Sequence, residues 1–327
     1  MTSDIALGTM IFGEEGPRGT RPDDAERIIH AYLDAGGNHL DTANVYAGGR
    51  SEEVTGKAIN GKRDRIILAT KVNFPMGDGP NQRGLSRFNI MRAVEDSLRR
   101  LATDYIDLYY MHCWDYNTPI EESLRAFDDL VRQGKVRYIG MSNFKAWQVM
   151  KALSVSNASS LERFVAGQYQ YSLVMRDIEY EFVELFDSEG IGLTPWGPLG
   201  GGFLTGKYKR GDKPEEGRIA AMEDDTEEAW HRRNTERNWA IIDVMGSIAE
   251  ERGVTYSQVA VTWTRRQPTV SSVIIGVRTM EQLEDNLGAA ELELSDDEIQ
   301  RLNRASQLPE MYPYRFIESY SRKKVED

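Results

Sequence analysis

The part of the sequence that decides the fold reads IILATKV (Ile66–Val72), IDLYYMH (Ile106–His112) and VRYIGM (Val136–Met141). These three runs are short and rich in Ile, Leu, Val and Tyr, as buried parallel strands are. The segments between them, Arg87–Leu101 and Ile120–Gln133, have the apolar spacing of amphipathic helices. The order of strand, helix, strand, helix and strand therefore predicts a β/α repeat.

The same alternation extends along the rest of the chain. Five further strand candidates share this composition: Ile5–Thr9, Asn38–Thr42, Phe164–Gln168, Ile191–Pro195 and Ser272–Gly276. Most strand candidates follow one another at about 27 to 40 residues, the size of one β/α unit. Eight such units without a break in composition predict an α/β protein with a single closed (β/α)8 barrel, a TIM barrel. The rival fold is an open, doubly wound sheet.

The interval before the last strand candidate is longer, at about 81 residues, and it contains a highly charged segment. This segment, Lys209–Asn234, has few aliphatic residues. Loops of that length are usually functional lids or disordered, so we predict a mobile charged loop over 209–234. We expect the barrel to span residues 1–306, with long loops at its C-terminal face. The aromatic-rich tail, 307–327, is expected to pack across one end of the barrel.

Composition disfavours several classes of partner. The 327 residues include 40 Lys and Arg against 52 Asp and Glu, which gives a net charge of −12. A surface this acidic repels nucleic acids and anionic membranes, so we expect neither as a partner. No apolar run reaches the roughly 18 residues that a membrane-spanning helix needs. The sequence shows no secretory signal and holds one cysteine, which together predict a cytoplasmic protein.

Four chemically active side chains stand at predicted strand ends. Asp41 ends the second strand, Lys71 the third and His112 the fourth, while Tyr46 follows Asp41 by five residues. Barrel enzymes take their catalytic groups from the C-terminal ends of the strands, so we expect this tetrad on one rim. The ammonium is expected to lower the pKa of the phenol and make it a proton donor to a carbonyl.

The other two members of the tetrad have supporting roles in this hypothesis. Asp41 would keep Lys71 charged and oriented, and His112 would orient the carbonyl oxygen. Because nothing in the tetrad attacks covalently, we expect an external hydride donor.

The alternatives without a catalytic role are a structural Lys71–Asp41 ion pair and a core histidine at His112. The absence of metal-ligand spacing in the sequence disfavours a barrel hydrolase that depends on a metal. No G-x-G-x-x-G motif follows a strand, which disfavours a Rossmann dehydrogenase.

Six motifs together resemble the aldo-keto reductase superfamily: DTANVY (41–46), ATKV (69–72), DLYYMH (107–112), GMSNF (140–144), QYQYSL (168–173) and TPWGPLGGGFLTGKY (194–208). The resemblance covers nearly the whole chain, from Leu7 to about Ser306. It is nearest to the bacterial and channel-β-subunit-like branch, because the last strand and the helix after it read IIGVRTMEQLEDN (274–286). It implies a TIM barrel that reduces carbonyl compounds with a nicotinamide cofactor.

The resemblance also implies roles for individual residues. Tyr46 resembles the family's general acid, Lys71 and Asp41 its pKa-tuning pair, and His112 its substrate-orienting histidine. The positions that resemble cofactor-binding residues are Ser142, Asn143 and Gln168 at the carboxamide, Trp196 on the nicotinamide ring, Gly197, Leu199 and Lys207 at the pyrophosphate, and Gly276, Arg278, Gln282 and Asn286 at the adenosine end. An arginine beside a phosphate monoester favours NADPH/NADP+ over NADH, and that preference rests mainly on Arg278.

Three aromatic residues directly follow predicted strand ends: Phe12, Phe74 and Trp114. They are expected either to line a substrate pocket together with Tyr46 and His112, or to belong to the core.

Two functions remain open at this point. One is a reversible NADPH-dependent reductase of a small carbonyl or alcohol substrate. The other is a non-catalytic, NADPH-sensing regulatory subunit that resembles the channel β-subunits. Both a monomer and a homo-oligomer are compatible with the sequence.

Overall fold

The computed structural model describes residues 1–16, 18–211, 213–215 and 217–321. Its eight parallel strands form one sheet in the order β7-β6-β5-β4-β3-β2-β1-β8. Their bounds are β1 (Ile5–Gly8), β2 (His39–Asp41), β3 (Ile67–Val72), β4 (Ile106–Met111), β5 (Val136–Ser142), β6 (Phe164–Gln168), β7 (Gly192–Leu193) and β8 (Val273–Gly276). Spatial order thus follows chain order, as it does when each strand returns through its own helix.

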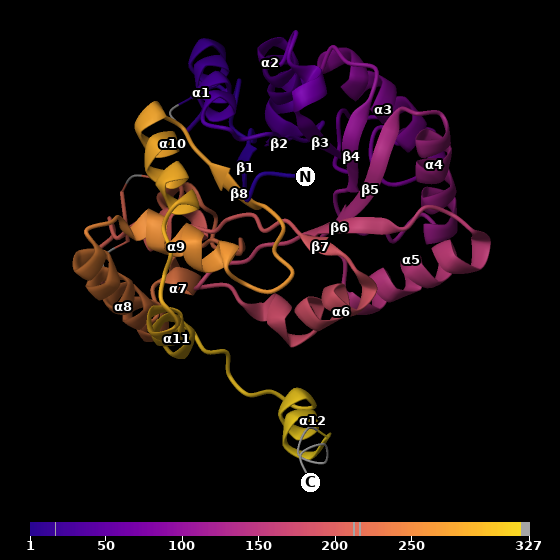
Figure 1. Cartoon of the computed structure of the whole chain (residues 1–327). Helices are drawn as coiled ribbons and strands as arrows, with labels where there is room; N and C mark the ends of the chain where they lie inside the picture. Colours follow the sequence, from indigo (N-terminus) through magenta and orange to yellow (C-terminus); the bar gives the residue numbers. More distant parts are fainter. Residues whose placement is uncertain (17, 212, 216, 322–327) are drawn as a thin grey trace.

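Hydrogen bonds between the segments around β7 and β8 close this sheet into a ring. The Leu193 amide donates to the Thr269 carbonyl at 2.8 Å, and the Ile274 amide donates to the Pro195 carbonyl at 2.8 Å. Because β8 also pairs with β1, no edge is left for an open sheet. The predicted (β/α)8 TIM barrel is therefore confirmed, and the doubly wound sheet is excluded (Figure 1).

Most of the helices surround the barrel because they present an apolar face to it (Figure 1). In α4, for example, Leu124 and Phe127 are buried while the acidic residues of the first turn are exposed. The helix bounds are α1 (Pro22–Asp34), α2 (Arg50–Ala58), α3 (Arg87–Arg100), α4 (Ile120–Arg132), α5 (Ala146–Ser159), α6 (Phe182–Glu189), α7 (Trp230–Arg233), α8 (Glu236–Arg252), α9 (Tyr256–Arg265), α10 (Met280–Leu287), α11 (Asp296–Ala305) and α12 (Tyr314–Ser321).

Alternate strand residues divide the core into an inner and an outer part. On β4, the Tyr109 ring faces outward and stacks on Phe127 of α4 at 5.1 Å. The next residue, Tyr110, faces inward and approaches β5 so closely that a Cβ on Gly140 would lie 2.5 Å from its ring. Position 140 therefore requires glycine. A small cluster of buried residues fills this inner part of the barrel: Ala69, Leu108, Tyr110 and Ala166.

The mobility of the charged segment 209–234 stays a prediction, but several of its residues are packed against the body of the protein. Among its described residues, Ile219 and Ala229 are fully buried, and Trp230 in α7 is 8% exposed. The Trp230 ring packs against Phe203 and Trp239. A few apolar residues therefore hold this segment against the body of the protein, although its average composition is that of a solvated loop.

Of the predicted tail, residues 307–321 are described, and 322–327 lie outside the described residues. Instead of lying across an end of the barrel, α12 projects away from it (Figure 1). Tyr312, Phe316 and Tyr320 are each more than half exposed. The tail contacts the body through Tyr180, whose hydroxyl donates to the Pro309 carbonyl at 2.6 Å and whose ring stacks on Tyr314 at 5.1 Å.

Among the described residues, no helix is both long and apolar enough to span a bilayer.

Candidate active site

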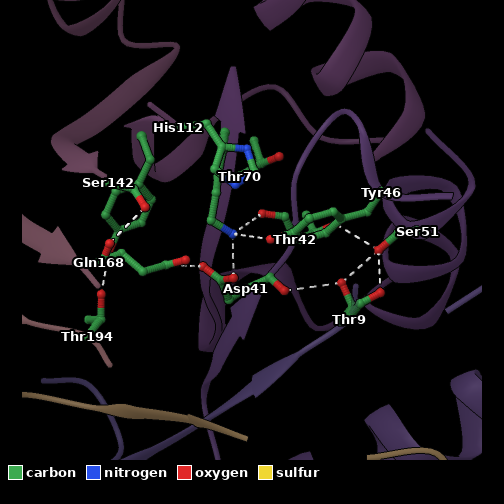
Figure 2. A network of polar contacts seen from close by, with 12 residues as sticks. Thr9, Asp41, Thr42, Tyr46, Ser51, Thr70, His112, Ser142, Gln168 and Thr194 are labelled. Atoms are coloured by element: carbon green, nitrogen blue, oxygen red, sulfur yellow. Dashed lines mark hydrogen bonds and ion pairs between the residues drawn. The ribbon is translucent and has the colours of Figure 1, made fainter. Parts of the chain in front are cut away.

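A network of polar side chains lies at the C-terminal rim of the barrel (Figure 2). Asp41 ends β2, Lys71 is the next-to-last residue of β3, and His112 directly follows β4. Tyr46 begins the 3-10 turn η1 (Tyr46–Gly49), in the loop between β2 and α2. Because parallel strands bring their carboxyl ends to the same rim, four side chains spread over 72 positions of the chain meet in one place.

Lys71 is fully buried and is held by three oxygen atoms. Its Nζ lies 2.5 Å from Asp41 Oδ1, 2.7 Å from the Thr42 carbonyl oxygen and 3.4 Å from the Tyr46 hydroxyl. Burial on its own favours the neutral amine, but Asp41 and Tyr46 outweigh it, and the pKa of Lys71 is raised above its ordinary value. A permanent ammonium therefore points at the Tyr46 hydroxyl.

The pKa of the Tyr46 phenol depends on its burial as well as on Lys71. Burial of the phenol raises the pKa of Tyr46, and the nearby Lys71 ammonium offsets this rise only in part. The ammonium does act to lower this pKa, as the sequence predicts, but the net shift is upward. A motif does not reveal how deeply the phenol is buried, and here burial outweighs the ammonium. The raised pKa means that Tyr46 is protonated at neutral pH, which is the state that a general acid requires.

His112 completes the set beside Tyr46. Its ring meets the Tyr46 ring edge-on at 5.8 Å and the Phe74 ring at 4.7 Å. Burial, together with the Lys71 charge, holds the pKa of His112 well below its usual value, so the imidazole is neutral at neutral pH. Its Nδ1 has no hydrogen-bond partner among the described residues. A neutral imidazole can donate one hydrogen bond, which suits a carbonyl oxygen.

An amide-rich rim adjoins the tetrad on the β5 and β6 side (Figure 2). Gln168 donates from Nε2 to Asp41 Oδ2 at 2.8 Å, and Ser142 donates to the Gln168 carbonyl at 2.7 Å. Asn143 donates to Ser142 Oγ at 2.9 Å and to the His112 carbonyl at 3.0 Å. Its φ of 55° lies in the left-handed region, which asparagine tolerates. This rim offers donors and acceptors that fit a carboxamide.

A glycine-rich loop follows β7 at the same end of the barrel. Trp196 is partly buried there, and Gly200, Gly201 and Gly202 have φ values of 56°, 72° and 93°. Three successive left-handed residues expose backbone amides in a way that only glycine allows without strain. Across the rim, a Cβ on Gly276 would meet nothing within 4 Å, so space is open beside the end of β8. This loop fits a phosphate-bearing ligand, which barrels commonly bind after strand seven.

Lys207 lies beside Gly202 of this loop, and the charge of Arg278, from a distant part of the chain, acts on it. The pKa of Lys207 is lowered, first by burial of the side chain and second by repulsion from Arg278. The Arg278 amide also donates to Gln282 Oε1 at 2.8 Å, at the start of α10, where Asn286 is buried. Cations that repel one another are best satisfied by a shared anion, so the residues present fit the phosphates of a dinucleotide.

Arg218 is a residue of this region that the sequence analysis missed. Its Nε donates to Glu228 Oε2 at 2.6 Å, and a Cβ on Gly201 would lie 3.2 Å from Glu228 Oε1. The pair therefore lies against the glycine-rich loop, and the Arg218 charge also acts on Tyr46. The signal that could have found it is Ile219, an apolar residue among charged ones, which marks this part of the segment as packed.

The predicted substrate-contacting aromatic residues divide into three cases. Phe74 is 38% exposed and packs on His112, so it lies at the site. Trp114 is partly buried and meets Phe144 edge-on at 5.1 Å, toward the β5 side. Phe12 is fully buried in the core and offers no surface to a substrate. A place after a strand end does not distinguish these cases, because the burial of Phe12 depends on how the loop after β1 folds, where Phe12 pairs with Thr20.

The described residues also bear on a metal site and on a cysteine nucleophile. Within the described residues, no group of three or more His, Cys, Asp and Glu side chains is arranged to hold a metal ion. Cys113 is half-buried, and burial raises the pKa of its thiol, which disfavours a thiolate nucleophile.

Comparison with known proteins shows a family match over nearly the whole chain. The aldo/keto reductase family model matches residues 4–307. The chain is 36% identical over 302 residues to a probable voltage-gated potassium channel subunit beta of Arabidopsis thaliana, covering 89% of each protein. It is 38% identical over 313 residues to the uncharacterized oxidoreductase YrpG of Bacillus subtilis, covering 92% of this chain and 91% of the relative.

A third relative carries a more specific name. It is the aryl-alcohol dehydrogenase (NADP(+)) of Phanerodontia chrysosporium, 33% identical over 332 residues, with 95% of this chain and 84% of the relative covered. Relatives named as oxidoreductases and dehydrogenases support oxidoreductase activity in general terms. Since the family model spans the whole barrel and the relatives match most of both chains, the chain belongs to the aldo/keto reductase family.

Proposed function

We propose that this protein reduces an aldehyde or ketone to the alcohol, reversibly, with NADPH as the hydride donor and Tyr46 as the general acid. One observation carries the proposal. The Tyr46 hydroxyl lies 3.4 Å from Nζ of the fully buried Lys71, and Asp41 fixes that Nζ at 2.5 Å. A protonated phenol held next to a permanent, buried ammonium can give up its proton and stabilise the phenolate that remains.

The residues that would hold NADPH extend along the rim. The nicotinamide end would lie on Trp196, with the carboxamide bound by the amide-rich rim of Ser142, Asn143 and Gln168. When bound, the cofactor supplies the hydride that the side chains of this site cannot provide. The rest of the dinucleotide would follow Gly197, Leu199, Lys207 and Arg218 at the phosphates and Gly276, Arg278, Gln282 and Asn286 at the adenosine end.

The chemistry of this chain's residues begins with binding of the carbonyl oxygen. The neutral His112 imidazole and the Tyr46 hydroxyl would each donate a hydrogen bond to it. As the carbonyl carbon accepts hydride, negative charge grows on the oxygen, which takes the Tyr46 proton. The phenolate is then stabilised by Lys71, whose own charge Asp41 maintains. In the direction of alcohol oxidation, the same phenolate accepts the proton back.

The preference for NADPH and the character of the substrate rest on separate observations. Arg278 places positive charge at the adenosine end, where a phosphate monoester would add negative charge, and this charge also acts on Lys207. One relative carries NADP(+) in its name together with an aryl alcohol. The exposed Phe74 ring beside His112 gives the substrate side an apolar wall. These features favour NADPH and a carbonyl compound with an apolar or aromatic substituent.

The test is turnover on a panel of aldehydes, ketones and sugars with NADPH and with NADH, scored by kcat/KM. Tyr46→Phe should lower kcat by about 10²- to 10⁴-fold while NADPH still quenches the protein fluorescence. Tyr138→Phe is the matched control, because Tyr138 is an exposed phenol near the opposite end of the barrel. Turnover retained in Tyr46→Phe would contradict the assignment of the acid.

The second candidate is a non-catalytic, NADPH-sensing regulatory subunit. The likeness to plant proteins named probable potassium channel subunit beta favours it, at 36% and 37% identity. Both candidates use the same cofactor residues, so binding alone does not separate them. NADPH binding without turnover on any member of the panel would favour the regulatory subunit. The single cysteine and the acidic composition are in line with a cytoplasmic location for either function.

A further inference from the structure

The turn that carries Tyr46 has an unusual backbone. The three residues after Tyr46 all lie in the left-handed region, with φ values of 48° at Ala47, 66° at Gly48 and 99° at Gly49. At Ala47 this conformation is strained, because its Cβ crowds the following carbonyl oxygen. Strained backbone persists only where the surrounding structure holds it in place. Contacts from outside the turn must therefore set its conformation, and with it the place of the Tyr46 hydroxyl.

The first of these contacts is Ser51, at the start of α2. Ser51 is fully buried, although it is polar. Its Oγ donates to the Thr9 carbonyl at 2.7 Å and lies 2.8 Å from the Thr9 hydroxyl and 2.9 Å from the Thr42 hydroxyl (Figure 2). Thr42 directly follows Asp41, so Ser51 connects α2, the helix after the turn, to the catalytic end of β2.

Glu52 makes a second set of contacts, to β3 and α3. Its carboxylate is fully buried, and both oxygens are used. Oε1 accepts from the Thr70 hydroxyl at 2.6 Å, and Oε2 accepts from Arg100 Nε at 2.7 Å. Thr70 is the residue directly before Lys71, so the carboxylate joins α2 to the strand that carries the ammonium. A buried carboxylate without these partners would be strongly destabilised.

Arg100 returns from α3 to the turn itself. A Cβ on Gly49 would lie 2.9 Å from Arg100 Cδ and 3.1 Å from Arg100 Nε. The arginine side chain therefore rests on the bare backbone of Gly49, three residues after Tyr46. The positive φ and this close approach both require glycine at position 49. One carboxylate, Glu52, thus joins the strand of Lys71 to the side chain that covers the turn of Tyr46.

We propose that Glu52 is a positioning residue for the general acid, whose bonds to Thr70 and Arg100 set the separation between the Tyr46 hydroxyl and Lys71 Nζ. The inference rests on the proposed function, in which Tyr46 is the acid. At 3.4 Å, this separation is at the outer limit of a hydrogen bond. A shift of a few tenths of an ångström therefore removes the contact with the ammonium. The phenol then loses its hydrogen bond to Lys71, which is one of the contacts that lower its pKa, so that pKa rises further and the phenol becomes a weaker acid.

The test compares Glu52→Gln with Glu53→Gln. The two residues are neighbours with the same side chain, but Glu53 is exposed, so its substitution is the matched control. Glu52→Gln should lower kcat about tenfold or more, keep the Kd for NADPH within about twofold, and move the basic limb of the pH profile to higher pH. Thr70→Val, which removes one of the two bonds to Glu52, should act in the same direction with a smaller effect. Glu53→Gln should change none of these quantities.

A purely structural role for Glu52 predicts a different result. Glu52→Gln would then lower the melting temperature while kcat per NADPH-binding site and the pH profile stay as in the wild type. That outcome would overturn the proposal. If Glu52→Gln does not fold, Thr70→Val decides the question by the same readouts.

A second readout does not depend on turnover. The ultraviolet absorbance of phenolate, as the difference between each protein and its Tyr46→Phe counterpart, follows the titration of Tyr46 alone. An upward shift in Glu52→Gln relative to wild type supports the positioning role, and identical titrations overturn it. If the wild type reduces no carbonyl compound, the proposed function fails, but this titration still tests Glu52.

Discussion

Substituting Lys71 by Met, Asp41 by Asn, and both together separates the stability of their ion pair from its part in catalysis. The pair lies in the barrel with Nζ and Oδ1 2.5 Å apart, and the side chains are 0% and 4% exposed. All three variants should lose activity under the proposed function. Their stabilities should differ, however, because each single substitution leaves one buried charge without its partner, and the double substitution leaves none.

The size of these stability changes follows from the separation of Nζ and Oδ1 and from the burial of both side chains. At an effective dielectric constant of about 20, unit charges at this distance attract by about 7 kcal/mol. Removal of both ions from water offsets most of this attraction, so the pair as a whole contributes little. Removing one partner still costs about 3–5 kcal/mol, since the other charge stays buried. The double variant should lie within about 2 kcal/mol of the wild type.

The assay is urea unfolding at neutral pH, followed by tryptophan fluorescence. The pKa of Lys71 is raised in the folded protein, so its contribution to stability is complete below the ordinary lysine pKa. It is lost only as the pH rises through the folded pKa, so a measurement at neutral pH captures all of it. A double variant destabilised by the sum of the two single effects, within about 0.5 kcal/mol, would refute the reasoning.

Three further predictions concern the cofactor site, the histidine and the turn. Lys207→Met and Arg278→Met should each weaken NADPH binding, measured by calorimetry, about tenfold or more. The pKa of Lys207 is lowered, so the affinity of the wild type for NADPH should fall as the pH rises through the pKa of Lys207. The pKa of His112 is also lowered by folding, so wild-type stability should fall as the pH drops below about 6.5; a urea midpoint in His112→Gln that falls just as steeply would contradict this. Gly49→Ala should cost about 1–3 kcal/mol, and more than Gly48→Ala in the same unfolding assay, because only position 49 has Arg100 within 2.9 Å of the added Cβ.

The barrel was predictable because its signals are local. Each strand is a short apolar run and each helix has its own period, so a chain read in sequence order yields the β/α repeat that the structure confirms. The members of the tetrad could be named for a related reason. A residue at the end of a parallel strand points to the same rim whatever the details of packing, and the structure brings Asp41, Tyr46, Lys71 and His112 together there.

Other features depend on contacts between distant segments and were not predictable in this way. Phe12 and Phe74 both follow strand ends, yet one is fully buried and the other is 38% exposed. The segment 209–234 has the composition of a loop, but Ile219 and Trp230 anchor it and bring Arg218 to the glycine-rich loop. The tail has an aromatic composition that suggests packing, and yet α12 projects away from the barrel.

The sequence by itself determined the order of strands and helices, the acidic surface and the chemical identity of the groups at the rim. These features follow from periodicity, charge and residue type, which do not depend on contacts between distant segments. The tertiary structure alone decided the acidity of Tyr46, because burial acts on its phenol more strongly than the neighbouring ammonium does. It alone also joined Glu52, Thr70 and Arg100 around the turn of Tyr46. Desolvation and hydrogen bonding depend on what surrounds a group in space, and residues 48 positions apart become neighbours only when the barrel closes.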